Sequence, residues 1–150
     1  MDIKEPVIRI SVRSLVEFIL RSGDIDNRIA AADKDAMQLG SRIHRKIQRR
    51  MGADYRAEVP LKYEILCRGY VILLEGRADG IIETKKGTVI DEIKGVFKDI
   101  HVLEKPAEVH LAQARCYAYI YASQHGLSEI GVQMTYCNME NEDIKRFQSV

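Results

Sequence analysis

The stretch Gly76-Arg77-Ala78-Asp79-Gly80, followed after a short turn by Val89-Ile90-Asp91-Glu92-Ile93-Lys94-Gly95, decides how this chain is interpreted. Residues 71–83 and 88–93 are rich in Val, Ile and Leu, whereas residues 84–87 are polar and end in glycine. Apolar, β-branched runs on both sides of a polar turn predict a β-hairpin.

The hairpin fixes which charged side chains meet. If residues 84–87 form its loop, Asp79 falls opposite Glu92, and cross-strand partners lie about 5 Å apart at Cβ. Two carboxylates at that distance can bind one cation. The period of two puts Glu92 and Lys94 on one face of the second strand and sends Asp91 and Ile93 to the other. An acid two residues before a lysine occurs four times in the chain, so a surface hairpin with a cross-strand Lys/Glu pair is the alternative interpretation.

Composition indicates one folded domain over residues 1–150. The chain has 46% hydrophobic and 30% charged residues and only three prolines. No apolar run approaches the roughly 20 residues of a membrane span and no signal peptide is visible, so we expect a cytoplasmic protein with no membrane partner. Three widely spaced cysteines predict no disulfide. The net charge of +1 implies that any affinity for nucleic acid is local.

Periodicity divides the chain into elements of both kinds. We expect strands at 8–11, from 55 to 93 as an antiparallel meander, and at 130–137. Helices are predicted from residue 11 to about 23, from about 33 to 51, and from Pro106 to about 124. Residues 24–32 and 97–105 read as connections. The chain stops after residues 138–150 without a closing feature, which leaves open that it is one domain of a longer polypeptide.

The second predicted helix has three kinds of surface. At 100° per residue, Leu39, Ile43 and Ile47 form an apolar stripe, and the basic cluster of Arg42, Arg45, Lys46 and Arg49 covers the other side. That cluster is either a solvated face or a surface that follows phosphates. His44 lies on the flank of the stripe and can point inward, either as a core histidine or as a metal ligand. On the third helix, a polar stripe runs beside an apolar row and contains His110, Gln113, Tyr117, Tyr121 and Gln124.

The order of these motifs resembles the PD-(D/E)XK nuclease superfamily, and more narrowly its RecB-like branch, which includes CRISPR-associated exonucleases. The resemblance runs from about Gly40 to Tyr136. It implies an α/β restriction-endonuclease-like core, with a central mixed, largely antiparallel β-sheet flanked by helices on both faces and the last strand at a sheet edge. A weaker similarity is to nuclease-type domains fused ahead of bacterial helicases.

The resemblance also implies roles for individual residues. Asp79 and Glu92 correspond to metal-binding acids, Lys94 to the lysine that acts on the attacking water, and His44 to a further metal ligand, with the Ile93 carbonyl completing the shell. Gln113 and Tyr117 match a motif that contacts DNA or supports the metal site, and Glu58 matches a supporting acid. Arg42, Lys46 and Arg49 are the candidate DNA-binding residues of the basic helix.

Oxygen ligands of this kind suit Mg²⁺ or Mn²⁺. Some relatives carry an iron–sulfur cluster on four cysteines, but Cys67, Cys116 and Cys137 do not match that spacing, so no cluster is expected from this segment. The sequence thus predicts a metal-dependent DNA exonuclease in repair or recombination that acts on single strands or duplex ends. The alternatives are a catalytically silent DNA-binding module serving a helicase, a structure-specific endonuclease, and a small α/β domain with incidental acids.

Overall fold

The computed structural model describes residues 5–20 and 34–150, with side chains placed for 5–20 and 39–150. The predicted connection at 24–32 lies outside the described residues. The elements follow in the order β1 (Val7–Ser11), α1 (Val12–Ile19), α2 (Lys34–Arg50), β2 (Tyr55–Cys67), β3 (Tyr70–Thr84), β4 (Gly87–Val96), the short 3₁₀ helix η2 (Ile100–Val102), α3 (Glu108–His125), β5 (Gly131–Asn138) and β6 (Ile144–Ser149).

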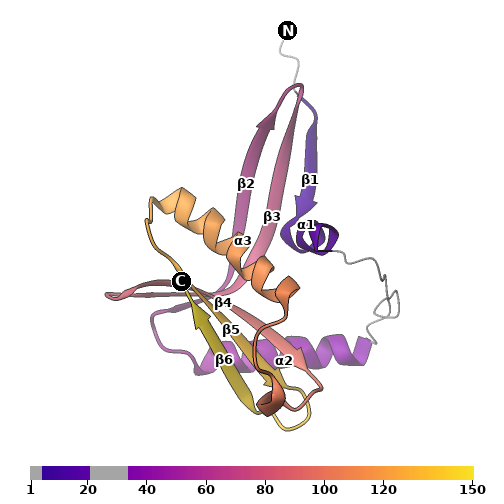
Figure 1. Cartoon of the computed structure of the whole chain (residues 1–150), viewed down its shortest axis with the longest axis vertical. Coiled ribbons are helices and arrows are strands. Elements are labelled where there is room, and N and C mark those ends of the chain that lie inside the picture. Colours follow the sequence, from indigo (N-terminus) through magenta and orange to yellow (C-terminus); the bar gives the residue numbers. More distant parts are fainter. Residues whose placement is uncertain (1–4, 21–33) are drawn as a thin grey trace.

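The described strands form one six-stranded mixed sheet, so the chain has an α/β fold, as expected (Figure 1). β2, β3 and β4 are an antiparallel meander, with a turn at Arg68-Gly69 and a second at Lys85-Lys86. β5 lies parallel to β4, and β6 pairs antiparallel with β5. β1 lies parallel to the first half of β3.

β3 is the strand that joins the two parts of the sheet. Along one edge it pairs with β2 over most of its length, so β1 and β4 share the opposite edge. β1 pairs with residues 71–75 and β4 with residues 80–84. We call the intervening residues 76–79, which neither strand pairs, the ladder gap. The β2 ladder also omits one pair there, Glu58 opposite Asp79.

The register of the hairpin is the predicted one, although its turn is shorter than expected. Thr84 pairs with Gly87 and Gly80 with Asp91, so the two-residue turn leads to the same alignment as the proposed four-residue loop. The ladder ends at the Gly80–Asp91 pair. Asp79 and Glu92 therefore stand just beyond the last paired residues, where β3 and β4 separate.

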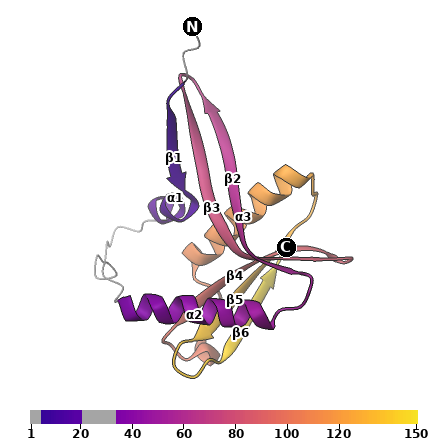
Figure 2. The ribbon, with the colours of Figure 1, turned by 180° about the vertical axis from the view of Figure 1, so that it is seen from behind.

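Helices cover both faces of the sheet (Figures 1 and 2). Ile90 belongs to the large core under α3, which also takes in Val12 and Val16 of α1. Ile93, three residues along β4 and hence on the opposite face, packs against Ile43 and Ile47 of α2. The predicted apolar stripe of α2 is thus confirmed.

Local signals account for the helix ends. The Ser11 side chain accepts a hydrogen bond from the Ser14 N–H and caps α1, whereas Gly126 ends α3 in the left-handed conformation at φ 64°. Pro106 lies two residues before the first residue of α3, rather than opening the helix as predicted.

The C-terminal part of the sheet differs from the expectation. The strand predicted at 130–137 is β5, but it lies inside the sheet, and β6 occupies the edge in the segment where no element was predicted. β6 was missed because it is polar and only partly buried, so its sequence lacks a clear apolar alternation. Within residues 5–20 and 34–150, no helix is long and apolar enough to cross a membrane.

Candidate functional site

Asp79 lies at the end of the ladder gap, and its carboxylate accepts a hydrogen bond from a backbone N–H of β4 where the strand ladder has stopped. Asp79 Oδ2 accepts a hydrogen bond from the Ile93 N–H at 2.7 Å, and His44 Nε2 lies 3.6 Å from the same oxygen. Burial raises the pKa of Asp79, but His44 and the Ile93 N–H outweigh it and the pKa is lowered overall. Asp79 is therefore a fixed, ionised carboxylate.

Unlike Asp79, Glu92 has a raised pKa and a carboxylate oxygen without a hydrogen-bond partner. Its side chain is buried, and among the described residues Glu92 Oε2 is the buried side-chain polar atom without a hydrogen-bond partner. Burial, and next the negative charge of Asp79, raises its pKa well above the usual range. An orphaned buried carboxylate oxygen is costly, so its presence beside a second carboxylate points to a site built to receive a cation or a proton.

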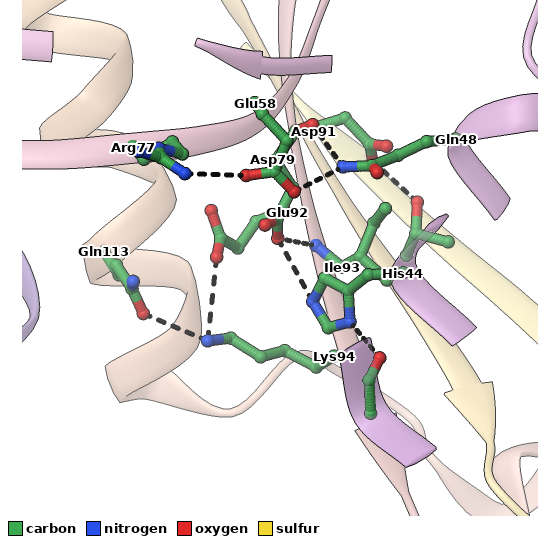
Figure 3. Close-up of polar contacts among 12 residues, drawn as sticks. His44, Gln48, Glu58, Arg77, Asp79, Asp91, Glu92, Ile93, Lys94 and Gln113 are labelled. Atoms are coloured by element: carbon green, nitrogen blue, oxygen red, sulfur yellow. Dashed lines mark hydrogen bonds and ion pairs between the residues drawn. The ribbon is translucent and has the colours of Figure 1, made fainter. Parts of the chain in front are cut away.

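His44 points inward, as the phase of the helix predicted. His44 Nδ1 lies 2.8 Å from the Gly40 carbonyl, one turn earlier on α2, and donates to it when it carries the proton. This contact leaves Nε2 directed at Asp79 (Figure 3). Burial lowers the pKa of His44, but the contacts with Asp79 and with the Gly40 and Ile93 carbonyls raise it overall. With Nδ1–H so anchored, Nε2 is the ring atom that becomes available to a cation when its own proton is displaced.

Lys94 lies on the other side of Glu92 and is oriented by α3. Lys94 Nζ is 3.6 Å from Glu92 Oε1 and donates to Gln113 Oε1 at 3.2 Å (Figure 3). Gln113 Nε2 in turn donates to the Tyr117 hydroxyl at 3.1 Å. Gln113 and Tyr117 are both buried. The predicted polar stripe of α3 thus faces the sheet, where Gln113 holds Lys94 and Tyr117 is buried.

Two glycines of the quoted motif make room for these contacts. A Cβ at Gly76 would lie 2.4 Å from the Tyr117 ring, and a Cβ at Gly80 would lie 1.9 Å from the Tyr55 ring. Tyr55 reaches over Gly80 to donate its hydroxyl to Asp91 Oδ2 at 2.7 Å. Each glycine flanking the Asp79 segment is therefore required by a tyrosine that lies against the backbone.

Glu58 is near the site but is not part of the carboxylate pair. It adopts a left-handed φ of 56°, accepts a hydrogen bond from Gln48 Nε2 at 3.0 Å, and lies 3.8 Å from Arg77. The Gln48 amide also donates to the Asp79 carbonyl at 2.9 Å, so it satisfies a backbone oxygen in the ladder gap. Gln48 was missed from the sequence, although its position one turn after His44 on the same flank of α2 was a signal.

The basic side chains of α2 line two separate cavities. Arg42, Lys46 and Arg49 line an open cavity of about 600 Å³, where Lys46 Nζ is 2.8 Å from both carboxylate oxygens of Glu142. A second cavity, of about 520 Å³, opens beside His44. Arg45 lines both cavities. Of the three arginine and lysine residues predicted to bind DNA, none lines the cavity at His44.

The residues of the site fit a divalent cation in type, though not as a preassembled cage. Asp79, Glu92 and the Ile93 carbonyl supply hard oxygen atoms, and His44 supplies a nitrogen atom next to them. In the described part of the chain, no group of three or more His, Cys, Asp and Glu side chains is arranged to hold a metal ion as it stands. Among the described residues, Glu92 Oε2 is a buried oxygen atom that no hydrogen bond occupies and that can accept a cation.

Comparison with known proteins shows the fold. No protein-family profile matches the chain, and no curated protein matches its sequence. The chain is similar to the crystal structure of SSO0001, with 22% sequence identity and a TM-score of 0.66. The match covers 98% of this chain and 68% of the SSO0001 chain. At this identity the similarity supports a shared α/β fold.

Proposed function

We propose that this protein is a Mg²⁺- or Mn²⁺-dependent deoxyribonuclease with a restriction-endonuclease-like core. The observation that carries the proposal is the meeting of His44, Asp79 and Glu92 at the end of the ladder gap, with Lys94 on the far side of Glu92. A buried acid with a free oxygen, a fixed carboxylate and an oriented lysine are groups that can hold a cation and stabilise the charge of a phosphodiester under attack.

In this proposal Asp79, Glu92, His44 Nε2 and the Ile93 carbonyl hold the cation. When bound, a divalent cation supplies charge neutralisation at the phosphate and lowers the pKa of a water molecule. The Ile93 N–H keeps Asp79 in one orientation through its hydrogen bond to Oδ2. Binding of a cation also relieves the cost of keeping Glu92 buried beside Asp79.

Lys94 has a separate role in the proposed reaction. Its ammonium group is held between Glu92 and Gln113, so it orients the attacking water and stabilises the negative charge that develops on the phosphate oxygens. Gln113 and Tyr117 act as positioning residues, because they contact Lys94 or one another rather than the surface.

The experiment that tests the proposal is a degradation assay on end-labelled single-stranded, double-stranded and closed circular DNA with Mg²⁺, Mn²⁺ or EDTA. We expect metal-dependent loss of linear DNA that Glu92→Gln abolishes and that the exposed-acid control Glu64→Gln retains. Lys94→Met should retain metal binding, measured by calorimetry, and lose most of the rate. Cleavage by Glu92→Gln at the wild-type rate would overturn the metal assignment.

A catalytically silent DNA-binding module is the second candidate. It is the alternative that the sequence leaves open. DNA binding without cleavage in either metal would decide for it. The exonuclease mode, the role in repair or recombination, the association with a helicase and the cytoplasmic location stay predictions from the sequence.

A further inference from the structure

The cavity beside His44 has two walls of different origin. One wall is α2, and the other is formed by Arg77, which lies in the ladder gap of β3, and by Glu58 of β2. Its volume is about 520 Å³, and its lining residues are Gly40, Ser41, His44, Arg45, Glu58 and Arg77. Because His44 both lines the cavity and contacts Asp79, the cavity borders the candidate metal site at His44.

Two arginines and one glutamate set the charge of this cavity. The Arg77 guanidinium lies 3.8 Å from the Glu58 carboxylate, and both side chains are well exposed, at 65% and 44% (Figure 3). An exposed ion pair of this length contributes little to stability, so Arg77 can exchange its partner readily. A phosphate diester offers guanidinium the same planar, two-oxygen contact that a carboxylate offers.

Glu58 is held in place more firmly than its partner. Its left-handed backbone conformation is unfavourable for a residue with a side chain, and the Gln48 amide bridges its carboxylate to the Asp79 carbonyl. The strained residue thus lines the cavity, and Gln48 ties it to the backbone of a candidate metal ligand. It is placed to keep Arg77 near the site.

Building on the proposed function, we propose that Arg77 and Arg45 form a subsite for a backbone phosphate of the nucleic-acid strand, next to the phosphate that is hydrolysed. Glu58 is the counter-ion that occupies Arg77 until the strand displaces it. The subsite lies on the His44 side of α2, whereas Lys46 on the other flank is already neutralised by Glu142. Since Arg45 lines both cavities, the strand continues from this subsite toward Arg42 and Arg49.

The test is the binding of a short fluorescein-labelled oligothymidylate, followed by fluorescence anisotropy with Ca²⁺ in place of Mg²⁺ and over a range of salt concentrations. Arg77→Gln should weaken binding roughly fivefold at about 0.1 M salt and lower the salt slope by about 0.7, the value of one phosphate contact on a single strand. Glu58→Gln should tighten binding by a similar factor. The matched control is Arg115→Gln, an exposed arginine on α3 that lines a different pocket, which should bind as wild type.

The outcomes separate this inference from the proposed function. If Arg77→Gln binds like Arg115→Gln while the wild type binds DNA and cleaves it with Mg²⁺, the subsite is wrong and the nuclease stands. Weaker binding by Glu58→Gln overturns the counter-ion role and favours the supporting acid predicted from the sequence. A wild-type protein that neither binds the oligonucleotide nor cleaves DNA overturns both proposals. Circular dichroism melts check that the variants fold.

Discussion

Asp91 and Glu92 are consecutive acids on β4. Their side chains lie on opposite faces of the strand and differ in how many hydrogen bonds their carboxylates accept. On the α2 side, buried Asp91 accepts hydrogen bonds from the Tyr55 hydroxyl, Gln133 Nε2 and Thr135 Oγ1, at 2.7, 3.1 and 2.6 Å. Toward α3, buried Glu92 keeps one oxygen without a partner. A saturated carboxylate holds strands together, whereas an unsatisfied one has capacity for a ligand.

The largest expected effect is on catalysis at the Glu92 face. We expect Glu92→Gln to lower metal-dependent DNA cleavage at least about a thousandfold, or ~4 kcal/mol of transition-state stabilisation, because it removes a charged ligand. Gel assays with end-labelled DNA measure the loss. Equal loss in the exposed-acid variant Glu64→Gln would show that the effect does not belong to this face.

The next effect is on stability at the Asp91 face. Asp91→Asn should lower the free energy of unfolding by about 3 kcal/mol, because an amide nitrogen cannot accept from Tyr55 and the network loses its charge. Urea denaturation gives the value. A variant as stable as wild type would mean that the two faces do not differ in the way the hydrogen bonds indicate.

Gly80 tests whether Tyr55 is the link between β3 and the Asp91 face. Gly80→Ala places a Cβ against the Tyr55 ring and should cost about 2 kcal/mol, measured by thermal melting. Gly52→Ala is the matched control, since nothing lies within 4 Å of a Cβ at that position. Equal melting temperatures for the two variants would remove the steric argument.

Glu92→Gln should have the opposite effect on stability from Asp91→Asn. Replacing a buried acid that has one oxygen without a partner and lies beside the negative charge of Asp79 should raise the free energy of unfolding by about 1 kcal/mol in the absence of metal. The measurement is urea denaturation at neutral pH in EDTA. A decrease in the free energy of unfolding as large as the one expected for Asp91→Asn would mean that both acids stabilise the fold.

An effect of similar size is expected as a pH response on the α3 side, at His110. Burial, followed by the charges of Lys94 and Arg13, lowers the pKa of His110 to about 4 from an ordinary value of 6.5. The stability from the neutral ring, which contacts the Tyr136 hydroxyl at 2.9 Å, is complete above pH 6.5 and is lost as the pH falls toward 4. The loss should be about 1 kcal/mol for this partly exposed group.

His110→Asn is the variant that checks this response, because its amide oxygen can still accept from Tyr136. Denaturation midpoints at several pH values between 6.5 and 4 should fall less for the variant than for wild type. Parallel midpoints would exclude His110 as the source.

Sequence reasoning predicted the parts of the site that local rules determine. The turn at residues 85–86 sets the hairpin register, which brings Asp79 and Glu92 to the same height, and helical phase turns His44 inward. It could not predict the left-handed Glu58, the bridging amide of Gln48 or the donors around Asp91. These depend on where three strands separate or pair across the sheet, which no short stretch of sequence specifies.

The hydrogen bond from the Ile93 N–H to Asp79 makes one backbone amide a spectroscopic probe. In most of a sheet an amide proton reports on a neighbouring strand, but this proton points at a carboxylate. Its NMR chemical shift will follow the charge on that carboxylate during a titration with Mg²⁺. A single resonance, observed without any label on the nucleic acid, can therefore report the fractional occupancy of the candidate metal site.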